Sequence, residues 1–423
     1  MNISSLKKYF ITDDISDWNT VLQNRLLVLM AFVIPFSSWW SKRIIISIFI
    51  LWLFRFSKED LLYVMQQKTV QYVFAFVALI GISWFYTEID PGTTEYYLKR
   101  FATFLLFPLI VVPLVLKQEY IKYLIGAFLA AVFVNEVISY GILFDLWWHL
   151  DNYGFPILGE MHHSTYSVMI AFAIILVLYE IVHEDKKYKM VVYLFFLFLM
   201  LGNLVISGGR TGQFSLVFAL LALLVMHYRK NMKAMFLLGL TPIIFFISVY
   251  YTYHPFSQRI NQAVIDVKNT VNNDNYGSSV GNRLGSYVLL YYIIEDNSLG
   301  DTLFGHGAGE LKWIKNSTID DHHLKNFQNS KSYYQFHNIY IDVFVGMGLI
   351  GLFILVLILT EIIRIKVKKN KLRYIKDSLV LVLIFSFIPH HTFYEKNIML
   401  IISLFVAILI VQEKSEKEVL NVS

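Results

Sequence analysis

GSSVGNRLGSY (277–287), FGHGAGE (304–310) and FHNIY (336–340) lie within or directly after residues 253–336, the only long polar stretch of the sequence. Most of the remaining 423-residue chain consists of apolar runs. Hydrophobic residues make up 57% of the chain and charged residues 16%, and the mean hydropathy is +0.55. This composition is far more apolar than that of soluble proteins. The sequence therefore predicts a single polytopic membrane domain, 1–423, in which 253–336 is one large loop outside the bilayer.

Twelve apolar runs approach the length of roughly 20 residues that a membrane-spanning helix requires. They lie near 24–40, 43–56, 69–87, 101–116, 120–147, 164–183, 188–207, 211–227, 232–252, 337–363, 375–391 and 397–412. We therefore expect an all-α integral membrane protein with about twelve transmembrane helices and a large helical loop between the ninth and the tenth. Inside the loop, 256–271 predicts one helix. A second should start near Ser278 or Ser279, either of which can cap it, and run to about Asp296.

The distribution of basic residues predicts the orientation of the chain. An even number of spans places both termini on one side of the membrane, and Lys and Arg are enriched in cytoplasmic loops. More than half of the 36 Lys and Arg residues fall on the side of the termini, with the densest cluster from Arg364 to Lys376. Both termini are therefore expected in the cytoplasm and the loop on the outer face. The first residues do not have the pattern of a removable signal peptide.

Composition also excludes several kinds of site. The sequence has no Cys, which rules out disulfides, thiol nucleophiles and thiolate metal ligands. Acidic and basic residues nearly balance in 253–336, so the loop is not a polybasic patch and no nucleic acid partner is expected. Any anion that binds there must be held by particular arginines.

Two arginines are candidates for binding an anion. Arg210 lies in ISGGRTGQ (206–213), between two apolar runs at the expected outer boundary of the membrane. A charge there is costly unless a polar or anionic group meets it, and a guanidinium pairs well with phosphate. The alternative is an arginine that reaches toward lipid headgroups. Arg283 flanks the apolar stripe of the second loop helix, one turn before Tyr287, as either a solvated rim residue or a second phosphate ligand.

His337 is the candidate base. It opens the tenth apolar run, where a neutral imidazole can take a proton from a hydroxyl group at the edge of a dry region. The alternative is a histidine that only satisfies the end of a helix. Asp342 does not share a tight helical face with His337, so no catalytic pair is predicted between them.

Two pairs of adjacent histidines are candidates for metal ligands. His162 and His163 precede the sixth run, and His390 and His391 stand at the end of the eleventh. Neighbouring residues point to different faces of a helix, so neither pair has the i, i+4 spacing of a helical metal site. The sequence therefore predicts no metal site and no cofactor.

Taken together and in order, four motifs resemble the O-antigen ligase family and its relatives, the O-antigen polymerases. They are SGGRTG (207–212), SVGNRLGSY (279–287), FGHGAG (304–309) and FHNIY followed by the glycine-rich GMGLIG (346–351). The resemblance covers about 161–352 and includes one large outer loop between the ninth and tenth of about twelve runs. Each motif alone is weak, and the ordered set distinguishes the superfamily better than it distinguishes ligase from polymerase.

The resemblance implies a membrane glycosyltransferase of the lipid-linked-sugar type, with its site at the periplasmic face of the cell inner membrane. It implies a metal-independent, inverting transfer of a glycan from undecaprenyl diphosphate to a lipid A core sugar. Arg210 and Arg283 would then hold the diphosphate and His337 would deprotonate the acceptor. The resemblance more loosely suggests His163 and Tyr166 at the cavity, and the positions of Tyr287 and Asn338 make them further cavity candidates.

Two other functions remain open from the sequence. An O-antigen polymerase would use the same donor but a second lipid-linked glycan as acceptor. A glycolipid transporter or flippase would make no bond; against it, the predicted central helices lack paired acidic residues that couple ions, with Glu136 the most plausible carboxylate in the membrane.

Overall fold

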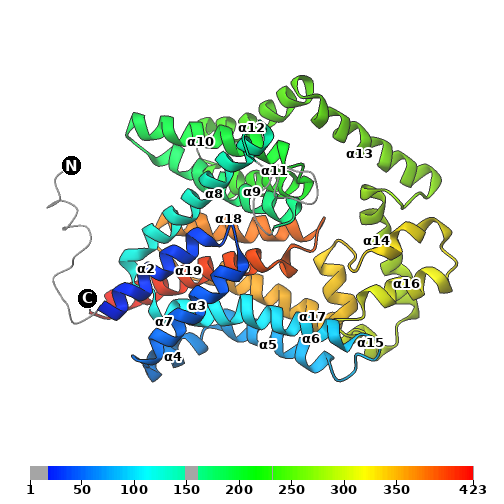
Figure 1. The fold of residues 1–423 in the computed structure, drawn as a ribbon, viewed down its shortest axis with the longest axis horizontal. Helices are drawn as coiled ribbons and strands as arrows, with labels where there is room; N and C mark the ends of the chain where they lie inside the picture. Colours follow the sequence, from blue (N-terminus) through cyan, green and yellow to red (C-terminus); the bar gives the residue numbers. More distant parts are fainter. Residues whose placement is uncertain (1–17, 148–160, 231, 423) are drawn as a thin grey trace.

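The computed structural model describes residues 18–147, 161–230 and 232–422. In these residues the fold is all-helical, with 83% helix and no strand. The expected all-α class is therefore confirmed. Figure 1 shows a bundle whose long helices run roughly along the longest axis, with a group of shorter helices at one end.

Each of the twelve predicted apolar runs coincides with a helix or a series of helices. They are α2 (Trp18–Val33), α3 (Ser38–Leu53), α5 (Lys68–Ser83), the series α6 (Pro91–Phe101), η2 (Ala102–Leu106) and α7 (Phe107–Val115), then α8 (Ile121–Leu143), α9 (His163–His183), α10 (Lys187–Ile206), α11 (Arg210–Tyr228), α12 (Met232–Thr252), α17 (Ile339–Arg364), α18 (Asn370–Phe387) and α19 (Lys396–Val422). Shorter connecting helices are α4 (Lys58–Met65), η3 (Gln118–Tyr120) and η5 (Thr392–Tyr394).

Seven helical segments of the described chain are long and apolar enough to cross a membrane. They are Pro91–Val115, Gln118–Leu143, His163–His183, Lys187–Ile206, Arg210–His227, Ile339–Arg364 and Lys396–Val419. Shorter apolar helices occupy Lys68–Ser83 and Ile243–Thr252. Length and composition thus support a multi-pass membrane protein, while the total of twelve spans stays a prediction.

Two predicted boundaries were wrong. The apolar pattern places the boundary between the first and second runs near residues 40 to 43, but α2 ends at Val33 and α3 begins at Ser38. Ser37 caps α3 by accepting a hydrogen bond from the backbone nitrogen of Trp40 at 3.4 Å. The predicted eleventh run extends to residue 391, but α18 ends at Phe387, two residues before Pro389, which has no backbone N–H with which to continue the helical hydrogen bonds.

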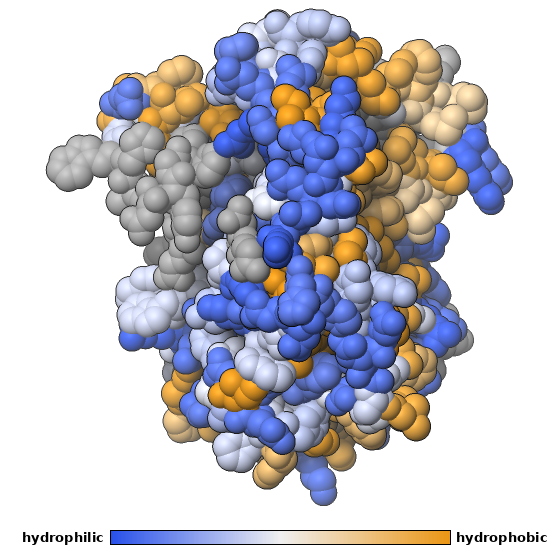
Figure 2. Space-filling view, turned by 90° about the vertical axis from the view of Figure 1, so that its right-hand side faces the viewer, coloured by the Kyte–Doolittle hydropathy of each residue, from blue (hydrophilic) through white to orange (hydrophobic). Residues whose placement is uncertain are grey.

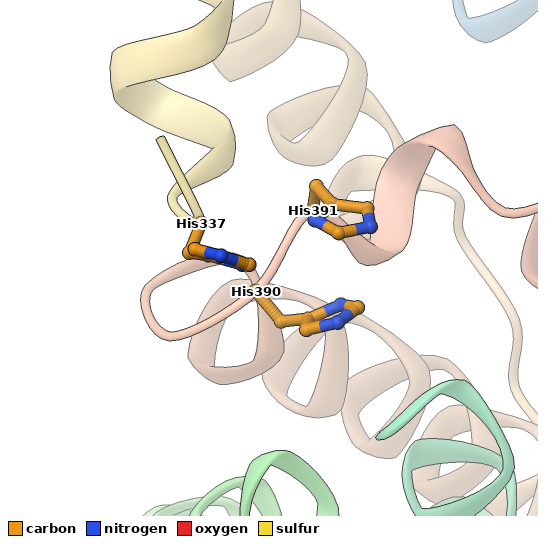
Figure 3. Close-up of side chains that lie close together, drawn as sticks. All are labelled: His337, His390 and His391. Carbon is orange, nitrogen blue, oxygen red and sulfur yellow. The ribbon is translucent and has the colours of Figure 1, made fainter. Parts of the chain in front are cut away.

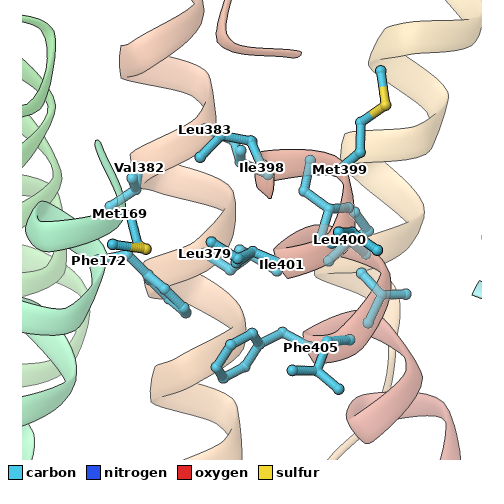
Figure 4. Packing of buried hydrophobic residues seen from close by; sticks show 14 of the residues in the cluster. Met169, Phe172, Leu379, Val382, Leu383, Ile398, Met399, Leu400, Ile401 and Phe405 are labelled. Carbon is cyan, nitrogen blue, oxygen red and sulfur yellow. The ribbon is translucent and has the colours of Figure 1, made fainter. Parts of the chain in front are cut away.

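The centre of the bundle is formed by α9, α18 and α19, which pack through closely fitted apolar side chains (Figure 4). Phe172 of α9 meets Phe405 of α19 edge to face, with ring centroids 4.9 Å apart. Met169 lies beside Val382 and Leu379 of α18 in the same cluster. Because lipid tails are as apolar as these side chains, close van der Waals packing rather than burial from water holds such helices together.

The stretch between α12 and α17 folds into five helices. They are α13 (His254–Asn273), α14 (Ser279–Asp296), α15 (Leu299–Phe304), α16 (Leu311–Asp321) and η4 (Lys325–Ser332). The first two confirm the predicted loop helices, and the Ser278 hydroxyl caps α14 by accepting from the backbone nitrogen of Gly281 at 3.0 Å.

A small core of its own fixes this helical region to the bundle. Leu289 and Ile293 of α14 pack with Leu311 of α16 and with Ile341 and Phe344 of α17. The region occupies the right-hand end of Figure 1, and the same end viewed face-on in Figure 2 is largely hydrophilic along its centre. This surface suits contact with water, whereas the flanks that Figure 2 colours orange are apolar.

Glycines join the FGHGAG turn to a break in α17. The backbone nitrogens of His306 and Gly307 donate to the carbonyls of Val345 and Gly346, each at 2.9 Å. Gly348 interrupts the helix with a φ of 64°, and a Cβ placed on it would lie 2.3 Å from the backbone of Leu303 in α15, just before the turn. Only glycine tolerates both the positive φ and this contact. The two motifs therefore form a structural junction that sets the direction of the first part of α17.

Candidate active site

Three helices begin around one small cavity. The cavity has a volume of about 210 Å³ and is lined by the starts of α9, α11 and α14 together with one side chain of α13. Its lining residues are His163, Ser164, Gly208, Arg210, Arg259, Ser279 and Arg283. No carboxylate is among these described residues, whereas three are guanidinium groups. Helix starts carry partial positive charge and unpaired backbone N–H groups, so the whole lining favours an anion.

Arg210 is the first residue of α11 and its guanidinium is incompletely satisfied. Nη2 donates to the backbone carbonyl of Arg259 at 3.3 Å. Nη1 is buried and has no hydrogen-bond partner. A buried donor without an acceptor is costly, and it is explained when a ligand supplies the acceptor.

The start of α11 lies unusually close to α9. The Gly212 backbone nitrogen donates to the Ser167 hydroxyl at 3.0 Å, and that hydroxyl donates to the carbonyl of Ser164 at 2.7 Å. A Cβ on Gly212 would stand 2.1 Å from the Ser167 carbonyl oxygen, and one on Gly209 would stand 2.2 Å from the Ser167 Cβ. The glycines of SGGRTG therefore hold Arg210 in place by allowing this close approach.

Arg283 reaches the cavity from the first turn and a half of α14. Its Nε donates to the carbonyl of Pro389 at 2.8 Å, and Nη1 donates to the backbone and side-chain oxygens of Ser279 at 2.7 and 2.8 Å. Burial, and then the neighbouring charge of Arg210, lower the pKa of Arg283. The same two causes lower the pKa of Arg259. The cations repel one another in a partly dry site, and an anion between them would relieve that repulsion.

An apolar groove adjoins the arginine cavity. It has a volume of about 670 Å³ and shares Arg210 with the smaller cavity. Its walls come from α11, α12 and α13 and are mostly aromatic and aliphatic, including Phe214, Phe218, Phe246 and Ile260. A cationic pocket that adjoins an apolar groove matches a ligand with a charged head and a hydrocarbon tail.

His337 lies beside the cavity without lining it. Arg283, which lines the cavity, donates to the carbonyl of Pro389. The two residues after Pro389, His390 and His391, lie next to His337. Their ring centroids lie 6.2 and 5.7 Å from that of His337. The structure thus brings Arg210 and Arg283 to one cavity and places His337 next to it.

The backbone at His337 is held in a conformation that few side chains adopt. Its φ is +56°, in the left-handed region. Such outliers persist only where the surroundings enforce them, and they concentrate at functional sites. The residue has this geometry directly before α17, whose N-cap is Asn338.

Buried polar groups brace the segment that carries His337. Asp342 accepts a hydrogen bond from the backbone nitrogen of Phe336 at 2.8 Å, and the Ser286 hydroxyl donates to the carbonyl of the same residue. Lys315 donates to the carbonyls of Tyr333 and Gln335, the second at 3.5 Å. These contacts fix the backbone directly before the strained position.

The surroundings keep the His337 imidazole neutral. Burial, followed by the charges of Arg283, Lys315 and His162, lowers the pKa of His337 to about 4. A neutral imidazole has a nitrogen lone pair that can accept a proton. A bound anion that offsets the nearby cations would raise this pKa and strengthen the base.

The other residues predicted at the cavity occupy different environments. His163 lines it. Tyr166 does not: it is fully buried in the bundle, where its hydroxyl accepts from Asn203 at 3.0 Å. Tyr287 is 49% exposed, and its hydroxyl accepts from the Asn338 side chain at 2.9 Å. Asn338 mainly caps α17, so Tyr287 links α14 to the start of that helix.

Two features of the site were missed from the sequence. Arg259 lies in a polar helix among other charged residues, and only tertiary packing brings it to the cavity. The sequence predicts His390 and His391 at the end of a helix, but they lie in the loop after α18, where their rings stack with centroids 4.0 Å apart. Pro389, which has no backbone N–H to continue a helix, was the available signal that the helix ends before them.

Comparison with known proteins supports the resemblance drawn from the motifs. Residues 195–356 match the family model described as O-antigen ligase. This region contains α11, the helices α13 to α16 and the first part of α17, and so includes Arg210, Arg259, Arg283 and His337. A search of curated proteins finds no match. Residues 195–356 thus carry a domain of the O-antigen ligase family, to which ligases and polymerases of lipid-linked glycans both belong.

Proposed function

We propose that the protein is an O-antigen ligase, which transfers a glycan from undecaprenyl diphosphate to a sugar of the lipid A core. The observation that carries this proposal is the meeting of three helix starts and three arginines at one cavity that adjoins an apolar groove. A lipid diphosphate has the matching chemistry, because its head is anionic and its tail is hydrocarbon. The partners are the lipid-linked donor, the lipid A core acceptor and the surrounding membrane lipids.

The donor would bind with its diphosphate in the arginine cavity and its isoprenoid chain along the groove. Arg210 and Arg283 would grip the phosphate oxygens, and Arg210 stands at the junction of the two spaces. Its unpaired buried Nη1 would then gain an acceptor. Arg259 adds a third positive charge to the same wall.

The proposed reaction is a direct displacement at the anomeric carbon. The acceptor hydroxyl oxygen forms a bond to that carbon while the bond from the carbon to the diphosphate oxygen breaks, with inversion. The hydroxyl proton passes to His337, and undecaprenyl diphosphate leaves with its negative charge held by the arginines. Preorganised cations that face the developing charge stabilise the transition state, which lets the reaction proceed without a metal ion.

In the proposed orientation both termini are cytoplasmic and the site faces the periplasm at the inner membrane. The loop helices α13 to α16 would cover the mouth of the site from the outside. The hydrophilic end of the molecule in Figure 2 agrees with exposure of this region to water.

Single substitutions in a strain that lacks the chromosomal gene test the proposal. Arg210→Ala and His337→Ala should insert at normal levels but fail to place glycan on the lipid A core. Arg364→Ala is the matched control, because Arg364 ends α17 at the end of that helix remote from His337 and pairs with Glu361. Normal transfer by both site variants would refute the proposal.

The same strain distinguishes the nearest alternative. If the protein is a ligase, its loss leaves core without any O-antigen. If it is a polymerase, the core retains a single repeat unit. Electrophoresis of lipopolysaccharide resolves the two outcomes. Purified protein that forms product from a lipid diphosphate donor in the presence of a chelator would support a transferase over a transporter and would also test the metal-independent mechanism.

A further inference from the structure

Three histidine rings converge beside the arginine cavity. His337 precedes α17, whereas His390 and His391 belong to the loop between α18 and η5. Figure 3 shows the three rings facing a common space from these two segments. One ring nitrogen from each residue can be chosen so that all lie within 4.8 Å of one another. Segments far apart in the sequence have therefore placed three potential metal ligands together.

One nitrogen atom of each ring in this cluster lacks a hydrogen-bond partner. Nδ1 of His337, of His390 and of His391 are each buried and unpaired. Buried polar atoms are nearly always satisfied, and each exception calls for an explanation such as a bound ion. Three exceptions on adjacent rings indicate a common ligand more strongly than three separate defects.

A carboxylate is positioned to support one of the rings. Glu395 Oε1 lies 3.7 Å from Nε2 of His391, which leaves Nδ1 of that ring for another partner. Arg100 holds the other oxygen of Glu395 at 3.4 Å. Histidines that bind metal commonly present their second nitrogen to a carboxylate, which orients the ring and increases its basicity as a ligand.

We propose that His337, His390 and His391 bind a divalent transition-metal ion of the kind that prefers imidazole, such as Zn²⁺. Three imidazoles leave a fourth tetrahedral position open. Zinc to nitrogen distances are about 2.0 to 2.1 Å, so the rings must turn slightly inward on binding. Arg283 and Arg100 oppose a cation here, and Glu395 offsets part of their charge.

Occupation of the site would stop glycan transfer. The metal would take the lone pair that His337 needs to accept the acceptor proton, so the ion would be an inhibitor rather than a cofactor. This second part rests on the proposed role of His337. The metal site itself rests only on the three rings and their geometry.

Cobalt provides a direct test of binding. The purified full-length protein in detergent should bind one Co²⁺ per chain, with the visible absorption of a tetrahedral site, and Zn²⁺ should displace it. His390→Ala and His391→Ala should lose this absorption, while Glu395→Gln should bind at least about tenfold more weakly. His254→Ala is the control, because His254 lies on the exposed start of α13 and should leave binding unchanged.

The outcomes separate the two parts of the proposal. No tetrahedral absorption in the wild-type protein, or equal absorption in all variants whose melting curves show that they are folded, would overturn the metal site. If Co²⁺ binds as expected, Zn²⁺ should also inhibit transfer reversibly, and a chelator should restore it. Binding without inhibition would retain the site but overturn the role of His337 as the base.

Discussion

Replacement of Gly212 by alanine tests whether the glycine motif acts by positioning Arg210. A Cβ at this position would lie 2.1 Å from the carbonyl oxygen of Ser167, whereas ordinary contacts begin near 3.4 Å. The neighbouring atom is backbone of α9, so it cannot rotate away. The start of α11 would have to retreat by about 1.3 Å, the difference between those two distances.

Both stability and activity should respond to this displacement. Overpacking of this kind typically costs about 1–3 kcal/mol of unfolding free energy. Because a misplacement of about 1 Å can reduce turnover on the order of 100-fold, the shift of Arg210 should affect transfer more than stability. The predicted result is a folded protein with strongly reduced glycan transfer.

Gly126 provides the matched control. It lies on the exposed side of α8, and a Cβ there has nothing within 4 Å. Gly126→Ala should therefore retain transfer and leave the melting temperature unchanged or slightly higher, because alanine favours helix over glycine by about 1 kcal/mol. The 8 tryptophans allow melting to be followed by intrinsic fluorescence, and purified protein with a lipid-linked donor reports transfer. A Gly212→Ala protein that transfers glycan as fast as the control would refute the positioning argument.

Three further predictions concern the segment around His337. Because the pKa of His337 is lowered to about 4, the free enzyme keeps a neutral base well below pH 6.5, and on acidification kcat/KM for the donor should fall only near pH 4. Bound diphosphate raises this pKa, so on acidification kcat should begin to fall at a higher pH than kcat/KM does. Acid limbs of kcat and kcat/KM at the same pH would contradict this prediction. Asp342→Ala should destabilise the protein by about 1–3 kcal/mol and reduce transfer, because the backbone nitrogen of Phe336 loses its acceptor, whereas Asp342→Asn should retain most of both in the same melting and transfer assays. Gly348→Ala should lower the melting temperature, because alanine at this positive φ with extended ψ adds about 1–3 kcal/mol of backbone strain to a 2.3 Å contact with Leu303. An unchanged melting curve would argue against the junction.

Apolar length predicted most of the fold, because a helix in a membrane must satisfy its own backbone and therefore leaves a long apolar run in the sequence. The loop helices were also predictable, since Ser278 is a good N-cap and the stretch before it is rich in turn-forming residues. The predicted helix boundaries were wrong where an apolar stretch of sequence continues past the end of a helix. Pro35 and Ser37 mark the break between α2 and α3, but the apolar composition on either side conceals it.

The candidate site was only partly accessible to the same reasoning. Arg210 and His337 stood out because each is a polar residue where the chain enters the membrane, whereas Arg283 was singled out mainly by the resemblance of SVGNRLGSY to the family. Arg259 had no such contrast with its neighbours. Arg259 reaches the cavity because α13 turns back toward the start of α11 after α12 ends, and this tertiary arrangement cannot be predicted from the local sequence.

The motifs and the chemistry of this protein have different physical origins. The glycines of FGHGAG and GMGLIG allow the backbones of these two motifs to contact each other directly. The glycines in both motifs are therefore explained by this structural junction and not by ligand binding. The cationic character of the cavity comes instead from three helices that start at one point, which adds their dipoles to the charges of the arginines. A different hydrogen bond fixes each helix start. At α11 the Gly212 backbone nitrogen donates to the Ser167 hydroxyl, and at α14 the Gly281 backbone nitrogen donates to the Ser278 hydroxyl. At α9 the Ser164 backbone nitrogen donates to the His162 ring. A substitution that loosens any one of these contacts should therefore weaken anion binding without removing a single positive charge.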